Sequence, residues 1–209
     1  VNDNEPPAIV GGSAIALSVP ENTTAVDDVD ATDPEGKTMT YSIAGGVDSG
    51  KFTIVPSTGV LTFITTPDYE NPTDANLDNI YRAIVQVTDG WSAPSQTIDV
   101  TITDVDEPPV ITSNGGGSTT AVSVMENTTA VTTVVATDPE SATIIYSISG
   151  GADSTKFNIN SSSGALTFNT PPDYHAPTDV GLNNVYDVVV QASDGLLTDT
   201  QAIAVSIGS

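Results

Sequence analysis

The chain repeats its own sequence at a constant spacing of 105 residues. Glu-Asn-Thr-Thr-Ala-Val begins at Glu21 and again at Glu126, and Ala-Thr-Asp-Pro-Glu begins at Ala31 and again at Ala136. No gap interrupts the alignment from Glu21 to Ile102, and roughly 46 of its 82 positions are identical. We therefore expect the 209 residues to fold as two copies of one small unit.

The boundary between the copies falls in the linker Asp104-Val105-Asp106-Glu107-Pro108-Pro109. Its paired prolines stiffen the linker and prevent a helix from crossing it. We expect repeat 1 over residues 1–105 and repeat 2 over residues 106–209. The one length difference between the copies lies in the glycine-rich loop 114–118 of repeat 2, which absorbs extra residues easily.

Within each copy, apolar and polar residues alternate with a period of two. The run 80–88, for example, places Tyr81, Ala83, Val85 and Val87 on one face. Short β-branched runs separated by Gly, Pro, Asn and Asp indicate strands and turns. About seven strands in roughly 100 residues are typical of an immunoglobulin-like sandwich. The sequence therefore predicts an all-β chain of two tandem immunoglobulin-like Greek-key β-sandwiches with about seven strands each.

The charge of the chain excludes several classes of partner. The 27 acidic and 4 basic residues give a formal net charge of −23, which repels nucleic acid and anionic lipid, because both bind through Lys and Arg. No apolar run of 18 residues is present, so we expect no membrane insertion. The chain has no cysteine, and a secreted protein without disulfides needs another source of stability, such as a bound metal.

Many acidic residues lie in turns next to the predicted strands. Each copy has them in four such places: the Glu after the first strand, Asp-Pro-Glu, Pro-Asp-Tyr and Asp-Gly. The loops of a sandwich gather at its two ends, where clustered carboxylates repel one another unless a cation is present. Ca²⁺ takes about six to eight oxygen ligands and suits such loops, whereas zinc would find no Cys and only one His. The pattern predicts calcium as the cofactor.

These motifs resemble those of the cadherin repeat. The segment 2–7, Asn-Asp-Asn-Glu-Pro-Pro, resembles the cadherin interdomain linker, and Pro-Glu-Asn at 20–22 matches a cadherin motif. Asp-Pro-Glu at 33–35 resembles its Asp-x-Asp, Pro-Asp-Tyr-Glu at 67–70 its Leu-Asp-Arg-Glu, and the strand end at Asp89 its Ala-x-Asp. The resemblance covers both copies in the same order, and the acidic, cysteine-free composition is similar to that of bacterial cadherin-like repeats.

The resemblance implies a calcium cage of up to three ions at the junction of the repeats. Its ligands would come from the lower end of repeat 1, from the linker and from the upper end of repeat 2. They are Glu21, Asp68 and Glu70; Asp104, Asp106 and Glu107; and Asp138, Glu140 and Asp194. Because the linker is one residue shorter than the cadherin pattern, the ion on the linker side is expected to be shifted or absent.

The two outer ends of the chain are expected to differ from the junction. The resemblance implies a partial site with one ion at the N-terminal end, formed by Asn2, Asp3, Asn4, Asp33, Glu35 and Asp89. At the C-terminal end His175 stands where repeat 1 has Glu70, and no acidic linker follows. No full site is expected there.

Other polar and aromatic positions have structural interpretations beside functional ones. Asp48 and Asp153 follow Gly-Gly and are expected to shape a turn, and the oxygen-rich segment 74–78 is interpreted as a turn rather than a calcium loop, because its copy loses two of three ligands. Trp91 either packs against the sandwich or offers an exposed platform for a sugar. No nucleophile elbow or phosphate loop is present, so we expect no enzyme.

The sequence thus predicts a calcium-rigidified structural and adhesive doublet from a large bacterial extracellular or cell-surface protein. The expected partners are calcium and neighbouring repeats, with like modules or a polysaccharide as further candidates. The alternative is a carbohydrate-binding module of a secreted polysaccharide-degrading protein, which would depend on Trp91.

Overall fold

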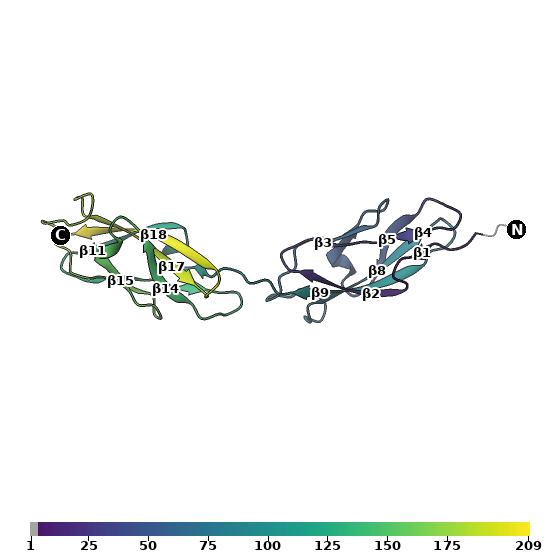
Figure 1. Cartoon of the computed structure of the whole chain (residues 1–209), viewed down its shortest axis with the longest axis horizontal. Coiled ribbons are helices and arrows are strands. Elements are labelled where there is room, and N and C mark those ends of the chain that lie inside the picture. Colours follow the sequence, from purple (N-terminus) through teal and green to yellow (C-terminus); the bar gives the residue numbers. More distant parts are fainter. Residues whose placement is uncertain (1–3) are drawn as a thin grey trace. The chain divides into compact units, whose positions relative to one another are not determined.

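The computed structural model describes residues 4–209 (Figure 1). The chain divides into two compact units, Val1–Val105 and Asp106–Ser209, and each is described by itself. Within residues 4–209, no helix has the length and apolar character needed to cross a membrane. Besides strands, this part of the chain contains three short 3-10 turns.

Residues 4–105, the described part of the first unit, form nine strands. They are β1 (Ala8–Ile9), β2 (Ala14–Pro20), β3 (Ala25–Asp28), β4 (Ala31–Thr32), β5 (Thr40–Gly45), β6 (Phe52–Ile54), β7 (Val60–Phe63), β8 (Ile80–Thr88) and β9 (Ser95–Thr103). One sheet has the order β2-β9-β8-β5 and the other β3-β7-β6, with β1 paired to β4. The prediction of two β-sandwiches is confirmed.

Two of the seven expected strands are interrupted, which raises the number to nine. The first strand breaks at Gly11 and Gly12, whose φ angles of 85° and 84° are accessible to glycine at little cost. Before this break β1 pairs antiparallel with β4, and after it β2 pairs parallel with β9. The glycines therefore let one segment of chain contribute to both sides of the sandwich.

The alternation of residues along β8 places its apolar face in the core, as predicted. Tyr81, Ala83, Val85 and Val87 are each at most 1% exposed, while the residues between them are partly exposed. The Tyr81 ring meets Phe63 edge-on with a centroid distance of 5.2 Å. Its hydroxyl accepts a hydrogen bond from the backbone amide of a residue eight positions upstream at 3.0 Å, as in a tyrosine corner.

The second unit follows the same plan. Its strands are β10 (Val110–Ile111), β11 (Thr119–Met125), β12 (Ala130–Thr133), β13 (Ala136–Thr137), β14 (Ile145–Gly150), β15 (Phe157–Ile159), β16 (Ala165–Phe168), β17 (Val185–Ser193) and β18 (Thr198–Gly208). The sheet orders are β11-β18-β17-β14 and β12-β16-β15, with β10 paired to β13. Tyr186 and Phe168 repeat the edge-on aromatic contact at 5.1 Å.

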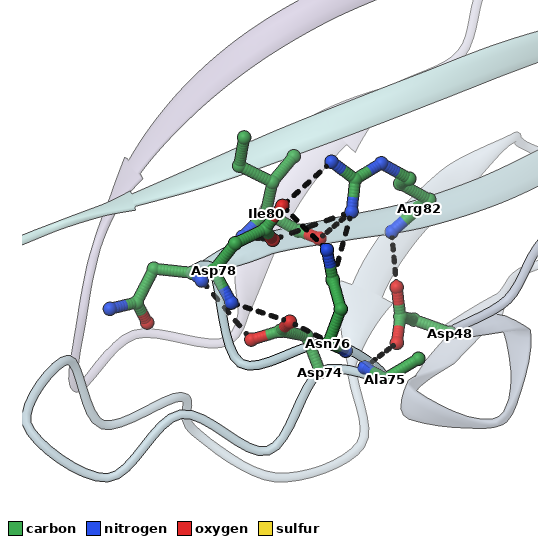
Figure 2. A network of polar contacts seen from close by, with 8 residues as sticks. Asp48, Asp74, Ala75, Asn76, Asp78, Ile80 and Arg82 are labelled. Atoms are coloured by element: carbon green, nitrogen blue, oxygen red, sulfur yellow. Dashed lines mark hydrogen bonds and ion pairs between the residues drawn. The ribbon is translucent and has the colours of Figure 1, made fainter.

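Asp48 joins the loop before β8 to that strand, a role larger than the turn expected from the sequence (Figure 2). It is 3% exposed, and its Oδ1 accepts a hydrogen bond from the Ala75 amide at 2.6 Å. Its Oδ2 accepts one from the Arg82 amide at 2.9 Å. Asp153 accepts the corresponding hydrogen bonds from the backbone amides of Val180 and Asp187, at 2.8 and 2.9 Å. A buried carboxylate thus satisfies backbone donors from two segments in each unit.

The segment 74–78 is a turn organised by its own aspartate, as expected (Figure 2). Asp74 is 3% exposed and accepts backbone amides of Asp78 at 2.9 Å and Asn79 at 3.1 Å. Asp78 Oδ2 accepts a hydrogen bond from Arg82 Nη2 at 3.0 Å. This hydrogen bond is the main reason that the pKa of Asp78 falls to about 2. The turn therefore has internal partners for its carboxylates.

Replacing Asp48 with Asn should destabilise the first unit by about 2–4 kcal/mol, because a buried amide group would face backbone N–H donors in place of a carboxylate oxygen. Urea unfolding followed by tryptophan fluorescence reports this unit through Trp91. Asp99→Asn, on a partly exposed strand position, is the matched control. Equal midpoints for the two variants would contradict the role of Asp48.

Candidate metal centres at the ends of the repeats

The C-terminal end of the first unit brings together three predicted ligands. One oxygen from each of Glu21, Asp68 and Glu70 lies within 4.8 Å of the other two. Glu21 is only 2% exposed, and its Oε2 accepts the Tyr69 amide at 2.7 Å while its Oε1 accepts the Val105 amide at 2.9 Å. These bonds fix the carboxylate between the turn before β8 and the segment that follows β9.

The neighbouring predicted ligands are more open to solvent. Asp68 is exposed, and its Oδ1 accepts the Asn71 amide at 2.9 Å. Asp104 is exposed and directly follows the last residue of β9, Thr103. Buried Glu21 and exposed Asp68 therefore form one cluster of oxygens that is held by backbone amides and reachable from solvent.

At the N-terminal end of the second unit, two aspartates each use one oxygen and leave the other without a partner. Asp138 Oδ1 accepts the Ala142 amide at 2.8 Å, and Asp194 Oδ1 accepts the amides of Leu196 and Leu197 at 2.6 and 2.7 Å. The Oδ2 atoms of both aspartates are buried and have no hydrogen-bond partner. Because an unpartnered buried carboxylate oxygen is costly, this arrangement fits a cation.

Three further predicted ligands belong to this end. Burial raises the pKa of Glu140, and the negative charges of Asp138 and Glu107 raise it further. This coupling requires that the three carboxyl groups lie near one another. Asp106 is exposed and Glu107 half-buried at the start of the unit. The negative charges of these carboxylates repel one another, and a hard cation bound among them would reduce that repulsion.

The N-terminal end of the first unit has a similar arrangement. Asp33 Oδ1 accepts the amides of Glu35 and Lys37, each at 3.0 Å, and Asp33 Oδ2 is buried without a partner. Glu35 Oε2 accepts the Glu5 amide at 3.2 Å. Of the linker residues predicted here, Asn2 and Asp3 lie outside the described residues. Asn4 is described, and its Oδ1 is buried without a partner.

Asp89, the fourth acid of this end, already has partners for both oxygens. Its side chain is 0% exposed. Oδ1 accepts the amides of Ser92 and Trp91, each at 2.8 Å, and Oδ2 accepts Asn4 Nδ2 at 2.7 Å. The Ser92 amide, the Asn4 side chain and the Trp91 amide together lower the pKa of Asp89 to about 2. Asp89 is therefore fully charged at any physiological pH.

Lys37 makes this end differ from its copy. Its Nζ lies 3.9 Å from Asp89 Oδ2 and 5.7 Å from the centre of the Trp91 ring. Repeat 2 has Ala142 and Leu196 at the positions of Lys37 and Trp91. Repeat 1 thus supplies a cation of its own beside Asp89, whereas the corresponding Asp194 keeps a buried, unpartnered oxygen. The sequence pattern alone does not predict this role of Lys37.

The C-terminal end of the second unit contains a cluster that the predicted ligand set did not include. Glu126, Asp173 and His175 offer ligand atoms within 4.8 Å of one another. They stand 105 residues after Glu21, Asp68 and Glu70, so the repeat spacing was the signal that identifies them. An imidazole nitrogen replaces one carboxylate oxygen, and Ca²⁺ prefers oxygen. The expectation that no full calcium site forms at this end stays a prediction.

Trp91 does not pack into the sandwich. Its side chain is 74% exposed, and Leu196, its copy, is 82% exposed. Packing, one of the two interpretations drawn from the sequence, is therefore wrong. The exposed ring contacts Lys37, as described above.

Comparison with known proteins places the fold and the repeats in one family. The model of the cadherin domain matches residues 15–104 and again residues 120–207. Human protocadherin Fat 1 is 29% identical over 223 residues, which cover 99% of this chain and 4% of that protein. Mouse cadherin-related family member 2 is 28% identical over 192 residues, or 84% of this chain and 14% of that protein. The chain spans only a small fraction of these relatives.

A solved structure of human protocadherin-24 EC1-2 aligns with 99% of each chain, with a TM-score of 0.56 and 19% identity. Human CDH23 EC21-23 aligns with 98% of this chain and 70% of that chain, with a TM-score of 0.52 and 18% identity. At these identities the likeness establishes the fold alone. The match to the cadherin domain family favours an adhesion-type module over the carbohydrate-binding alternative.

Asp89 should titrate near pH 2, well below an ordinary aspartate. Because its folded pKa is lowered, Asp89 stabilises the fold above about pH 4, and this contribution disappears as the pH falls toward 2. Carboxyl-carbon NMR titration measures the pKa directly. Asn4→Ala should raise the pKa of Asp89 by removing one hydrogen bond; no change in that variant would contradict the contact between the two side chains.

Proposed function

Because the chain belongs to the cadherin family, we propose that it is a calcium-binding doublet that acts as a structural and adhesive module outside cells. Its role would be non-catalytic. Calcium at the repeat ends would restrain the linker and set the spacing of neighbouring repeats in a longer protein. The bacterial origin expected from composition stays a prediction.

The observation that carries the proposal is the pair of buried, unpartnered oxygens on Asp138 and Asp194. Each aspartate is oriented by backbone amides through one oxygen, which presents the other at low conformational cost. The oxygen of a buried carboxylate needs a donor or a cation, and the family of the chain favours the cation.

The residues that would hold calcium are those whose carboxylates cluster at the repeat ends. Around the linker they are Glu21, Asp68, Glu70, Asp104, Asp106, Glu107, Asp138, Glu140 and Asp194. At the N-terminal end Asn2, Asp3, Asn4, Asp33, Glu35 and Asp89 would form a partial site, in which Lys37 competes for the charge of Asp89. Calcium supplies positive charge and a large oxygen coordination shell, and the protein supplies ligands already held by amides.

Charge balance explains why such a module would respond to calcium. The chain carries a net charge of −23, and like charges concentrated at loop ends destabilise the compact state. Extracellular calcium modules have dissociation constants of about 10⁻⁴–10⁻³ M, which suits the millimolar calcium outside cells. Removing calcium would restore the repulsion and loosen the connection between the repeats.

Calcium at about 2 mM should stabilise the chain by about 0.6–1.8 kcal/mol for each ion bound, relative to EDTA, as expected for binding with such a dissociation constant. Calorimetry measures the shift in melting temperature, and isothermal titration counts the ions. Asp194→Asn should lower both the shift and the number of ions, whereas Asp187→Asn, on an exposed strand position, should leave them unchanged. A melting temperature that calcium does not move would refute the proposal.

His175→Glu should create a calcium ligand at the C-terminal end of repeat 2, because it restores the three carboxylates that Glu21, Asp68 and Glu70 form in repeat 1. Isothermal titration should detect additional calcium binding, with an affinity in the millimolar range. His175→Gln is the control, since it changes the side chain without adding charge. Equal binding by the two variants would show that the third carboxylate is not what this end lacks.

A further inference from the structure

The first unit has an open groove on one edge of its sandwich, and none of the predicted calcium ligands lines it. It lies between β2 and β3 and has a volume of about 370 Å³. Ile15 and Leu17 of β2 and Val29 line it together with Asp27, Asp28 and Asp30. In the described part of the chain, β2 and β3 each pair with one strand only, so both are sheet edges.

The groove combines apolar side chains with uncompensated negative charge. Ile15 and Leu17 are half-buried and pack against the core. The ion pairs found among residues 4–209 are Lys37–Asp89 and Arg82–Asp78, so neither neutralises the three aspartates. Burial raises the pKa of nearby Tyr41, and the charges of Asp30 and Asp28 raise it further.

The second unit carries a bridge across the same edge. Asn114, in the longer loop between β10 and β11, has a left-handed backbone with φ of 54°. Its Oδ1 accepts a hydrogen bond from Thr132 Oγ1 at 2.9 Å, and its Nδ2 donates to Gln201 Oε1 at 3.1 Å. Thr120 Oγ1 donates to the Asn114 carbonyl at 3.1 Å. The loop thus ties β11 to β12.

The rim changes together with the loop. Repeat 2 has Thr132, Thr133 and Val135 at the positions of the three aspartates. Where its loop is present the rim is neutral, and where the loop is short the groove is open and acidic. This correlated difference distinguishes the groove from the shared framework of the two units.

We propose that the groove between β2 and β3 of the first unit binds an extended peptide segment of a partner protein that carries Lys or Arg beside apolar side chains. An extended segment can pair with the free backbone groups of an edge strand. Its alternate side chains would place apolar groups on Ile15 and Leu17 and cations beside the aspartates. This proposal does not depend on calcium binding.

The test uses the whole chain in millimolar calcium and an eight-residue peptide that alternates lysine and valine. Fluorescence anisotropy at about 0.15 M salt limits long-range attraction to the acidic surface. Asp27→Thr with Asp28→Thr, the residues of repeat 2, should weaken binding about fivefold to tenfold. Asp78→Thr with Asp187→Thr removes the same charge at exposed positions that do not line the groove, and should change binding less than twofold. Equal losses in the two double variants would overturn the proposal.

A second variant closes the groove with the longer loop of repeat 2. Residues 10–13 are replaced by residues 112–118, and Asp27→Thr supplies the hydroxyl that pairs with the transferred asparagine. Peptide binding should be lost while the melting temperature is retained. If this variant misfolds, the test is made on the unaltered chain by NMR. Adding the peptide should shift the amide signals of residues 14–17 and 25–30 most, and shifts concentrated elsewhere would overturn the proposal.

Two further outcomes would also overturn the proposal. A peptide alternating lysine and serine that binds as tightly as the lysine–valine peptide would show that the apolar side chains make no contribution. Self-association of the double variant Asp27→Thr, Asp28→Thr without any peptide binding by the unaltered chain would assign the aspartates to protection of an edge strand.

Discussion

The hydrogen bond from a backbone amide to a carboxylate organises both the loops and the ends of this protein. Asp48 and Asp153 hold the loop before the long strand by this bond, deep in each unit. At the unit ends the same bond orients Glu21, Asp138 and Asp194. In a chain with no cysteine, the bonds of Asp48, Asp153 and Glu21 connect segments 27 to 84 residues apart, as disulfides do in other proteins.

The loops and the ends differ in how many carboxylate oxygens remain without a hydrogen bond. In the loops both oxygens of the aspartate accept amides, so the charge is satisfied internally and needs no ligand. At the N-terminal end of repeat 2 only one oxygen accepts, and the buried second oxygen is left without a donor. In repeat 1 Asn4 and Lys37 approach the equivalent oxygen of Asp89. One motif can therefore serve as framework or as ligand, depending on what lies beside its second oxygen.

Much of this could be predicted from the sequence, because strand alternation and repeat spacing are local signals. The alternation along 80–88 identified the buried face of β8, and the 105-residue offset located corresponding acids in both units. The two hydrogen bonds that Asp48 accepts could not be predicted in this way, since the amides that donate them lie 27 and 34 residues away. The exposure of Trp91 and the position of Lys37 depend on how two loops meet, which no periodic pattern encodes.

Comparison of the two units separates framework from function within one chain. Asp48, Asp74 and Tyr81 recur as Asp153, Asp179 and Tyr186 with the same hydrogen bonds, so the fold requires them in each unit. Other differences change the charge of the ends and of one edge: Lys37 against Ala142, Glu70 against His175, and Asp27 against Thr132. Each of these changes the charge offered to solvent, whereas the core exchanges one apolar residue for another, as in Ala83 against Val188 and Val87 against Ala192. A duplicated sandwich can in this way present different ligand preferences at its ends and edges without altering the interactions that fold it.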